Sequence, residues 1–131
     1  MFTIEHIQAA ASKIKSGSDF PKFIKEIKEL GVKRNDVYVS NGLSIYFDDE
    51  DNAQQVSPDE YPTLVINEEA SAGKLEHALK VHQQGETDYI SFCKQAADAG
   101  VEKWVTDLDE MTCTYLDAGG NELVKETIPT I

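Results

Sequence analysis

The chain repeats part of itself without a gap, because residues 18–48 align with residues 87–117 at a constant shift of 69 positions. Seven positions are identical across this shift: Asp19, Phe23, Lys25, Gly31, Val32, Tyr46 and Asp48 match Asp88, Phe92, Lys94, Gly100, Val101, Tyr115 and Asp117. The matches include an acid at a helix start and a glycine at a helix end, where these residue types have structural roles. The sequence therefore predicts two internal repeats, 1–66 and 67–131, with the same order of elements.

Each repeat begins with the pattern of two helices. Apolar residues recur at intervals of three or four positions, and hydroxyl or acidic residues that suit an N-cap precede them. The expected helices run from Thr3 to 16–18, from Ser18 or Asp19 to Gly31, from Ser71 to Gln84 and from Thr87 to Gly100. Glycine is favoured at these ends because it adopts the left-handed conformation without strain.

After each closing glycine the apolar period changes to two, which indicates strands. Asn41-Gly42 lies between two alternating runs and predicts a tight hairpin turn with positive φ at both positions. Further strands are expected at 61–66, 103–108, 111–116 and 122–128. This order predicts an α+β fold, a tandem pseudo-repeat of two helices followed by antiparallel strands with one shared core over residues 1–131. A cleft is expected at the seam between repeats, unless one continuous sheet with helices on one face leaves none.

The balance of charge limits the partners of this chain. It carries 12 basic and 24 acidic residues, a net charge of −12. Because nucleic-acid binding depends on basic side chains that neutralise phosphates, we expect no direct nucleic-acid contact. A basic protein, or a DNA-binding protein, is the partner that such a surface attracts. No apolar run approaches the length of a spanning helix and no signal-peptide pattern opens the chain, so we expect a cytoplasmic location without a membrane contact.

Several motifs together resemble a known family. They are His82-Gln83-Gln84-Gly85-Glu86-Thr87-Asp88-Tyr89, Phe92-Cys93, Ala99-Gly100-Val101-Glu102-Lys103-Trp104, Met111-Thr112-Cys113-Thr114-Tyr115-Leu116-Asp117, Gly17-Ser18-Asp19-Phe20-Pro21 and Leu30-Gly31-Val32. The chain resembles, over nearly its whole length, a small family of uncharacterised bacterial domains of about 130 residues that occur in prophages and are often labelled "phage envelope protein". The resemblance implies prophage ancestry and no established activity.

His82 is the sharpest candidate for chemistry. It ends an apolar stripe formed with Leu75, Ala78 and Leu79 on one helix, where a hydrogen-bonded structural histidine is the commoner outcome. Cys93, His82 and Asp107 have the residue types of a nucleophile, a base and an acid, respectively. No sequence motif such as a nucleophile elbow places them together. Cys93 lies on the apolar face of an expected helix, and Cys113 alternates with Met111 and Tyr115 in an expected strand. Both are interpreted first as small packed side chains in a reducing compartment.

Other candidate sites concern binding. Trp104, Tyr115 and Tyr46 are candidates for a binding surface, because strand aromatics are often interface anchors. Packing in the core between helices and sheet is the more common outcome for such residues. No metal site is predicted, since the histidines and cysteines lack ligand spacing. The acidic run 48–52 is interpreted as a solvated turn, because Ala53 replaces the glycine of a calcium loop.

Two functional hypotheses follow from these observations. The first is a non-enzymatic protein-interaction domain of prophage ancestry, without a cofactor. The alternative is a small enzyme or ligand-binding protein that uses His82 and Cys93 at a cleft between the repeats. A pocket that contains His82 in a perturbed environment favours the alternative, whereas a fully packed His82 favours the first.

Overall fold

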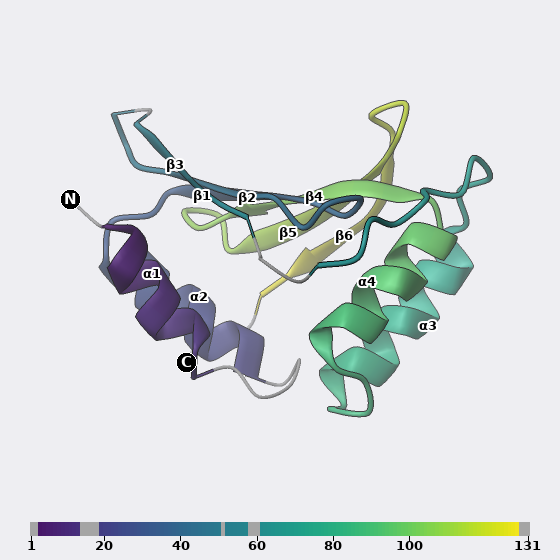
Figure 1. Ribbon diagram of the computed structural model, residues 1–131, viewed down its shortest axis with the longest axis horizontal. Coiled ribbons are helices and arrows are strands. Elements are labelled where there is room, and N and C mark those ends of the chain that lie inside the picture. The colour runs from purple at the N-terminus through teal and green to yellow at the C-terminus, as the bar shows by residue number, and fades with distance from the viewer. Residues whose placement is uncertain (1–2, 14–18, 51, 58–60, 129–131) are drawn as a thin grey trace.

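Six antiparallel strands form one sheet, and four helices lie against one of its faces, in the part of the chain that the structure describes (Figure 1). The computed structural model describes residues 3–13, 19–50, 52–57 and 61–128. The helices are α1 (Ile4–Ala11), α2 (Phe20–Glu29), α3 (Ala72–Gln83) and α4 (Tyr89–Asp98). The strands are β1 (Arg34–Tyr38), β2 (Ser44–Phe47), β3 (Ala53–Val56), β4 (Val101–Asp107), β5 (Thr112–Asp117) and β6 (Glu122–Thr127). The predicted α+β class is confirmed.

The two halves of the chain meet in the middle of the sheet. The strand order is β3-β2-β1-β4-β5-β6, so β1 of the first half pairs with β4 of the second. Asp36 lies opposite Val105 at this join. One continuous sheet therefore runs through both halves.

The helices form two pairs on the same face of the sheet, α1 with α2 and α3 with α4 (Figure 1). The pairs lie toward opposite edges, because α1 contacts the edge strand β3 and α3 contacts the other edge strand, β6. Buried apolar side chains of both halves form one cluster, in which Ile27, Leu75 and Leu108 are fully covered. Burial of such a side chain contributes about 1.5 to 3 kcal/mol.

Side-chain caps explain where most helices begin. Thr3, Ser71 and Asp88 each accept a backbone N–H at the start of α1, α3 and α4. The caps predicted at Thr3 and Ser71 are confirmed, whereas α4 is capped by Asp88 and not by Thr87. The hydroxyl and carbonyl of Thr87 lie against His82 instead. Helix α1 ends at Ala11, before the predicted end at 16–18, and residues 14–18 lie outside the described ranges.

The loop between β1 and β2 is longer than the predicted two-residue turn. Tyr38 N donates to Leu43 O, and Gly42 N donates to Tyr38 O, so residues 39–42 form the loop. Gly42 has a φ of 73°, whereas Asn41 is not among the described residues with positive φ. The predicted positive φ at Asn41 is wrong because its side chain closes the turn: Oδ1 accepts the Leu43 N–H at 3.0 Å.

Replacement of Gly42 tests this loop. Gly42→Val should lower the free energy of unfolding by about 1 to 2 kcal/mol or more, because a β-branched side chain is strained at positive φ. Asn41→Ala is the control, because it removes the hydrogen bond from Leu43 N to Asn41 Oδ1 but requires no positive φ at the substituted residue. Urea unfolding of both variants measures the difference. An unchanged midpoint for Gly42→Val would show that the glycine conformation is not required.

The strand predicted at 61–66 is wrong. This segment has no strand pairing; it crosses the end of β1, where Tyr61 Oη donates to Val39 O at 2.7 Å and Leu64 N donates to Ser40 O at 2.8 Å. Strand β1 already has a neighbour on both sides, and Pro62 has no N–H to offer a ladder. The polar run of β3 pairs with β2 instead.

The two halves correspond element by element at the shift of 69. Helices α2 and α4 have matching bounds, and Gly42 and Met111, with φ of 73° and 55°, occupy the same place in their hairpins. Asp48 and Asp117 each accept the N–H groups of the residues two and four positions later. Asp48 thus bonds to its own loop, as a solvated turn requires. These correspondences support the internal repeat, which stays a prediction.

Candidate functional site

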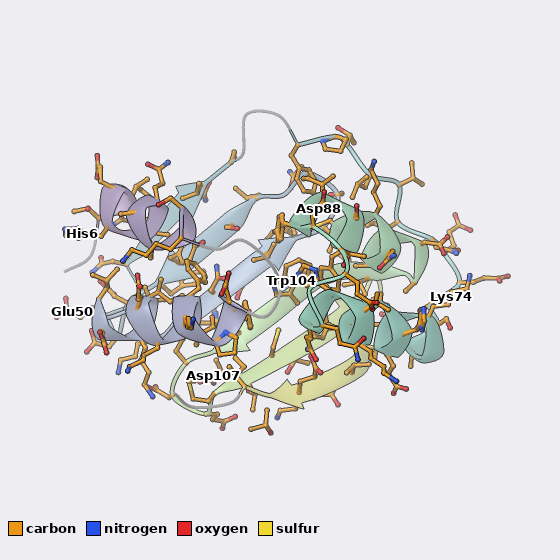
Figure 2. All side chains as sticks on the ribbon, turned by 90° about the horizontal axis from the view of Figure 1, so that it is seen from below. His6, Glu50, Lys74, Asp88, Trp104 and Asp107 are labelled. Atoms are coloured by element: carbon orange, nitrogen blue, oxygen red, sulfur yellow. The ribbon has the colours of Figure 1, made fainter. Side chains whose placement is uncertain are left out.

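A cavity of about 520 Å³, here called the central cavity, lies between the two helix pairs and the sheet. Seven aromatic side chains line it: Phe20, Phe23, Tyr46, Tyr89, Phe92, Trp104 and Tyr115. Trp104 lies between the helix pairs when the sheet is seen from the helix side (Figure 2). A continuous sheet with helices on one face therefore does leave a cleft at the seam, because the helix pairs lie toward opposite edges of the sheet.

The floor of the central cavity is a row of side chains that crosses the sheet. Ser44 is paired with Val37, Val37 with Trp104, and Trp104 with Tyr115. Tyr46 lies two residues from Ser44 and so projects from the same face. The three residues predicted for binding, Trp104, Tyr115 and Tyr46, thus all line this one space.

The described lining of the central cavity carries no ionic group: none of these residues is Asp, Glu, Lys or Arg, although 27% of the chain is charged. The polar members are Asn35, Ser44, His82 and Gln83. Charged groups keep to water because their burial without a partner is costly. The cavity is therefore suited to an uncharged occupant.

Aromatic rings form a connected wall on one side of the cavity. The His82 ring stacks on Phe92, with centroids 4.5 Å apart and an interplanar angle of 18°. Phe92 lies 5.7 Å from Trp104, which also meets Tyr115 at 5.8 Å and Tyr89 at 6.4 Å. These separations are typical of attractive ring pairs. The wall presents flat apolar surface with a nitrogen heterocycle at one end.

His82 is held by the connection between α3 and α4. Helix α3 ends at Gln83, and Gly85, with a φ of 80°, turns the chain back. Thr87 then lies against the ring, with its carbonyl oxygen and its hydroxyl each 3.1 Å from His82 Nδ1. Burial lowers the pKa of His82, although the Thr87 hydrogen bond and the charge of Asp88 act in the opposite direction. His82 is therefore neutral at pH 7 and half-buried.

The lowered pKa of His82 predicts a dependence of stability on pH. The ordinary pKa of the group is 6.5, so the unfolded chain takes up this proton before the folded protein does. The corresponding stability is present above pH 6.5 and is lost as the pH falls through the folded pKa. His82→Phe should lack this loss. Urea unfolding of both proteins at pH 7.5 and 5.5 measures it, and an identical pH dependence would contradict the burial of His82.

The indole nitrogen of Trp104 has no hydrogen-bond partner among the described residues. Within the described part of the chain, Asp36 Oδ1 is the buried side-chain oxygen or nitrogen without a hydrogen bond; it lies 3.2 Å from Arg34 Nε without hydrogen-bond geometry. Trp104 is 6% exposed and has no protein hydrogen bond there, so its Nε1 touches open space. Trp104 also lines the central cavity. Its indole N–H is thus a donor without a protein acceptor on a residue of the cavity lining.

The structure does not assemble His82, Cys93 and Asp107. Cys93 is fully buried on α4, and burial raises the pKa of its thiol despite hydrogen bonds with Tyr61 and Tyr89. Asp107 lies at the end of β4, where its Oδ1 accepts the N–H groups of the next turn. His82 lines the central cavity and the other two residues do not. A neutral thiol without a base beside it is a poor nucleophile.

Slow thiol chemistry is the expected result for the native protein. Cys93 and Cys113 are both buried, and burial raises the pKa of Cys113 to about 11. Both should react slowly with Ellman's reagent at neutral pH and fully after unfolding in urea. Cys93→Ala should lose about 1 to 3 kcal/mol of stability through lost packing. Rapid labelling that slows in His82→Ala would instead indicate an activated Cys93 thiolate.

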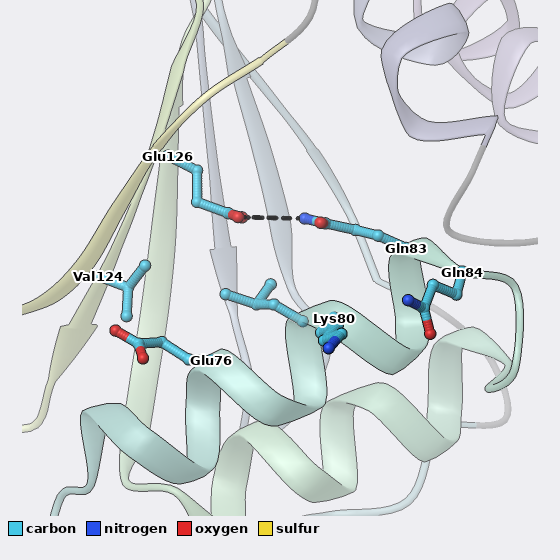
Figure 3. Close-up of a pocket in the computed structure, with 7 residues that line it drawn as sticks. Glu76, Lys80, Gln83, Gln84, Val124 and Glu126 are labelled. Carbon is cyan, nitrogen blue, oxygen red and sulfur yellow. Dashed lines mark hydrogen bonds between the residues drawn. The ribbon is translucent and has the colours of Figure 1, made fainter.

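A second, smaller cavity of about 320 Å³ lies between α3 and β6 (Figure 3). Its lining consists of Glu76, Leu79, Lys80, Gln83, Gln84, Val124 and Glu126. Gln83 donates to Glu126 at 3.1 Å. Most of these side chains are exposed and polar, and none is aromatic. This smaller cavity therefore lacks the flat apolar walls of the central cavity.

Sequence patterns did not reveal every lining residue. Asn35 is 4% exposed and donates its amide to Ile45 O at 3.1 Å, on the face of β1 that meets the cavity. A polar residue at an inward strand position was the available signal. Among the described residues, no group of three or more His, Cys, Asp or Glu side chains is placed to hold a metal. No described helix is both long enough and apolar enough to span a membrane.

Comparison with known proteins identifies a family for this chain but no individual relative. No curated protein matches it. A family described as protein of unknown function (DUF1398) matches residues 8–127, which is most of the chain. The expected resemblance to an uncharacterised domain family is thereby confirmed, and the chain belongs to the DUF1398 family.

Proposed function

We propose that this protein binds a small uncharged molecule in the central cavity. The observation that supports this proposal is a space of about 520 Å³ whose described lining has seven aromatic side chains and no ionic one, in a chain with a net charge of −12. Ligand sites typically measure about 300 to 1,000 Å³ and combine apolar walls with a few polar groups.

Binding fits the lining better than catalysis. Burial raises the pKa of Tyr46 and Tyr115, so their hydroxyls stay protonated near neutral pH. Around His82, the described lining residues supply no carboxylate or thiolate that would complete an acid–base pair. The polar groups therefore serve recognition in this proposal.

Fluorescence can test the proposal directly, because Trp104 is the single tryptophan of the chain and lines the cavity. Titration with 1-aminoanthracene, an uncharged probe, should give saturable probe emission together with quenching of Trp104. Ser44→Phe places a large side chain on the cavity floor and should abolish the signal. Thr114→Phe is the matched control, since Thr114 lies between Cys113 and Tyr115 and so projects from the opposite face of β5.

The outcomes separate clearly. Saturable binding that is lost in Ser44→Phe and kept in Thr114→Phe supports the proposal. Absence of saturable binding to the wild-type protein overturns it. Binding that is equally strong in Ser44→Phe also overturns it, because the probe then occupies another surface.

A protein-interaction role of prophage ancestry in the cytoplasm stays a prediction. The net charge of −12 supports a basic partner, and association through such charges weakens with salt. Affinity capture at low and high salt tests it. Retention of a basic protein at low salt alone would favour the interaction role.

A further inference from the structure

The His82 ring has a fixed position at the wall of the central cavity. Phe92 stacks on its face, with ring centroids 4.5 Å apart, and Thr87 lies 3.1 Å from Nδ1 at its edge. The stacking fixes the plane of the ring, and the contact at Nδ1 fixes how the ring is turned within that plane. The two imidazole nitrogens therefore have defined and different surroundings.

The contact at Nδ1 determines which nitrogen carries the proton. Two oxygens of Thr87, the carbonyl and the hydroxyl, each lie 3.1 Å from Nδ1. The carbonyl can only accept, and an unprotonated Nδ1 would set its lone pair against that oxygen, so we assign the proton to Nδ1. The other nitrogen, Nε2, then has an unprotonated lone pair and is an acceptor. The lowered pKa of His82 means that this neutral form is present at pH 7.

Nε2 has no hydrogen-bond partner among the described residues, and it is not a buried unpaired atom. It therefore touches open space, and His82 lines the central cavity. We infer that the occupant of the central cavity carries an N–H or O–H group that Nε2 of His82 accepts. This inference rests on the proposed binding function.

The surroundings define the chemical class further. Phe92 and Trp104 supply flat ring surfaces next to the acceptor, and no described lining residue is ionic. Aromatic rings stack on such surfaces without a charge. The occupant is thus an uncharged ring compound with a donor at its edge, such as a phenol or an N–H heterocycle. A ring of the same shape without the donor would leave Nε2 unpaired, which costs affinity.

Two probes of nearly identical shape separate this donor from general apolar binding. Indole has an N–H donor, whereas benzofuran has an oxygen at the same position and no donor. Isothermal titration calorimetry at pH 7.5 should show indole bound about tenfold more tightly than benzofuran, the effect of about one hydrogen bond. In His82→Phe the ratio of the two affinities should fall to about one, because the stacked ring is kept and the acceptor is lost.

His77→Phe is the matched control. It makes the same substitution on the same helix, at an exposed residue that does not line the cavity, and should keep the preference for indole. Equal affinities in the wild-type protein, or an unchanged ratio in His82→Phe, overturn the inference and leave the proposed function in place. If neither probe binds and 1-aminoanthracene does not bind either, the proposed function fails as well.

A measurement on the wild-type protein needs no variant. Protonation of His82 converts Nε2 into a donor, so the preference for indole should decline as the pH falls below the ordinary value of 6.5. Asp88, the charged group that acts on His82, has a lowered pKa and stays ionised over this range. A preference for indole that is the same above and below the pH at which the His82 ring is seen to titrate by NMR overturns the assignment of Nε2 as the acceptor.

Discussion

Gly100→Ala should lower the free energy of unfolding by about 2 to 5 kcal/mol, through backbone strain and overpacking together. Gly100 has a φ of 89°, where an L side chain is strained. A Cβ there would lie 2.6 Å from Ala70 Cα and 3.0 Å from Ala70 Cβ. Ala70 cannot move away easily, because the next residue, Ser71, donates its N–H to Ala99 O at 2.8 Å.

Gly31→Ala is the matched control for this prediction. Gly31 closes α2 as Gly100 closes α4, and its φ is 104°, but no heavy atom lies within 4 Å of a Cβ built there. It should lose only about 1 to 2 kcal/mol, the cost of the backbone conformation. Urea unfolding followed by far-UV circular dichroism measures both. Equal losses would contradict the close approach of Ala70.

Trp104→Ala should lose about 3 to 5 kcal/mol, the usual cost of truncating a large buried aromatic side chain. Trp104 is 6% exposed and contacts the rings of Phe92, Tyr89 and Tyr115. Its removal would enlarge the central cavity and leave those rings without their common neighbour. The variant has no tryptophan, so circular dichroism replaces fluorescence.

Val65→Ala provides the reference for Trp104→Ala. Val65 is 89% exposed, so its truncation should change stability by about 0.5 kcal/mol at most. A loss below about 1 kcal/mol in Trp104→Ala would be far under the usual cost of such a truncation. It would show that Trp104 is not packed as the structure places it.

Local chemistry made much of the fold predictable. Thr3 and Ser71 cap helices because their side chains accept nearby N–H groups, which only requires residues three positions away. Gly31 and Gly100 have positive φ at helix ends for a similarly local reason. Each of these features depends on neighbours in the sequence.

The sequence predictions were wrong where segments distant in the chain compete for the same strand edge or backbone group. Residues 61–66 have the composition of a strand, but β1 already pairs with β2 and β4. Asn41 turned its side chain to Leu43 N in a loop whose closing pair is Tyr38 and Leu43. Strand β3 is polar and is a strand because β2 offers it an open edge. Propensity alone does not report which edges are open.

The sequence by itself determined the α+β class, the four helices and the strands other than β3. Only the tertiary structure decided that the helix pairs lie toward opposite edges of the sheet, which leaves the central cavity between them. It also brought His82 to that cavity and kept Cys93 and Asp107 away from it. The physical reason is that a cavity is bounded by faces of elements far apart in the chain, whereas caps, turns and alternation act between near neighbours.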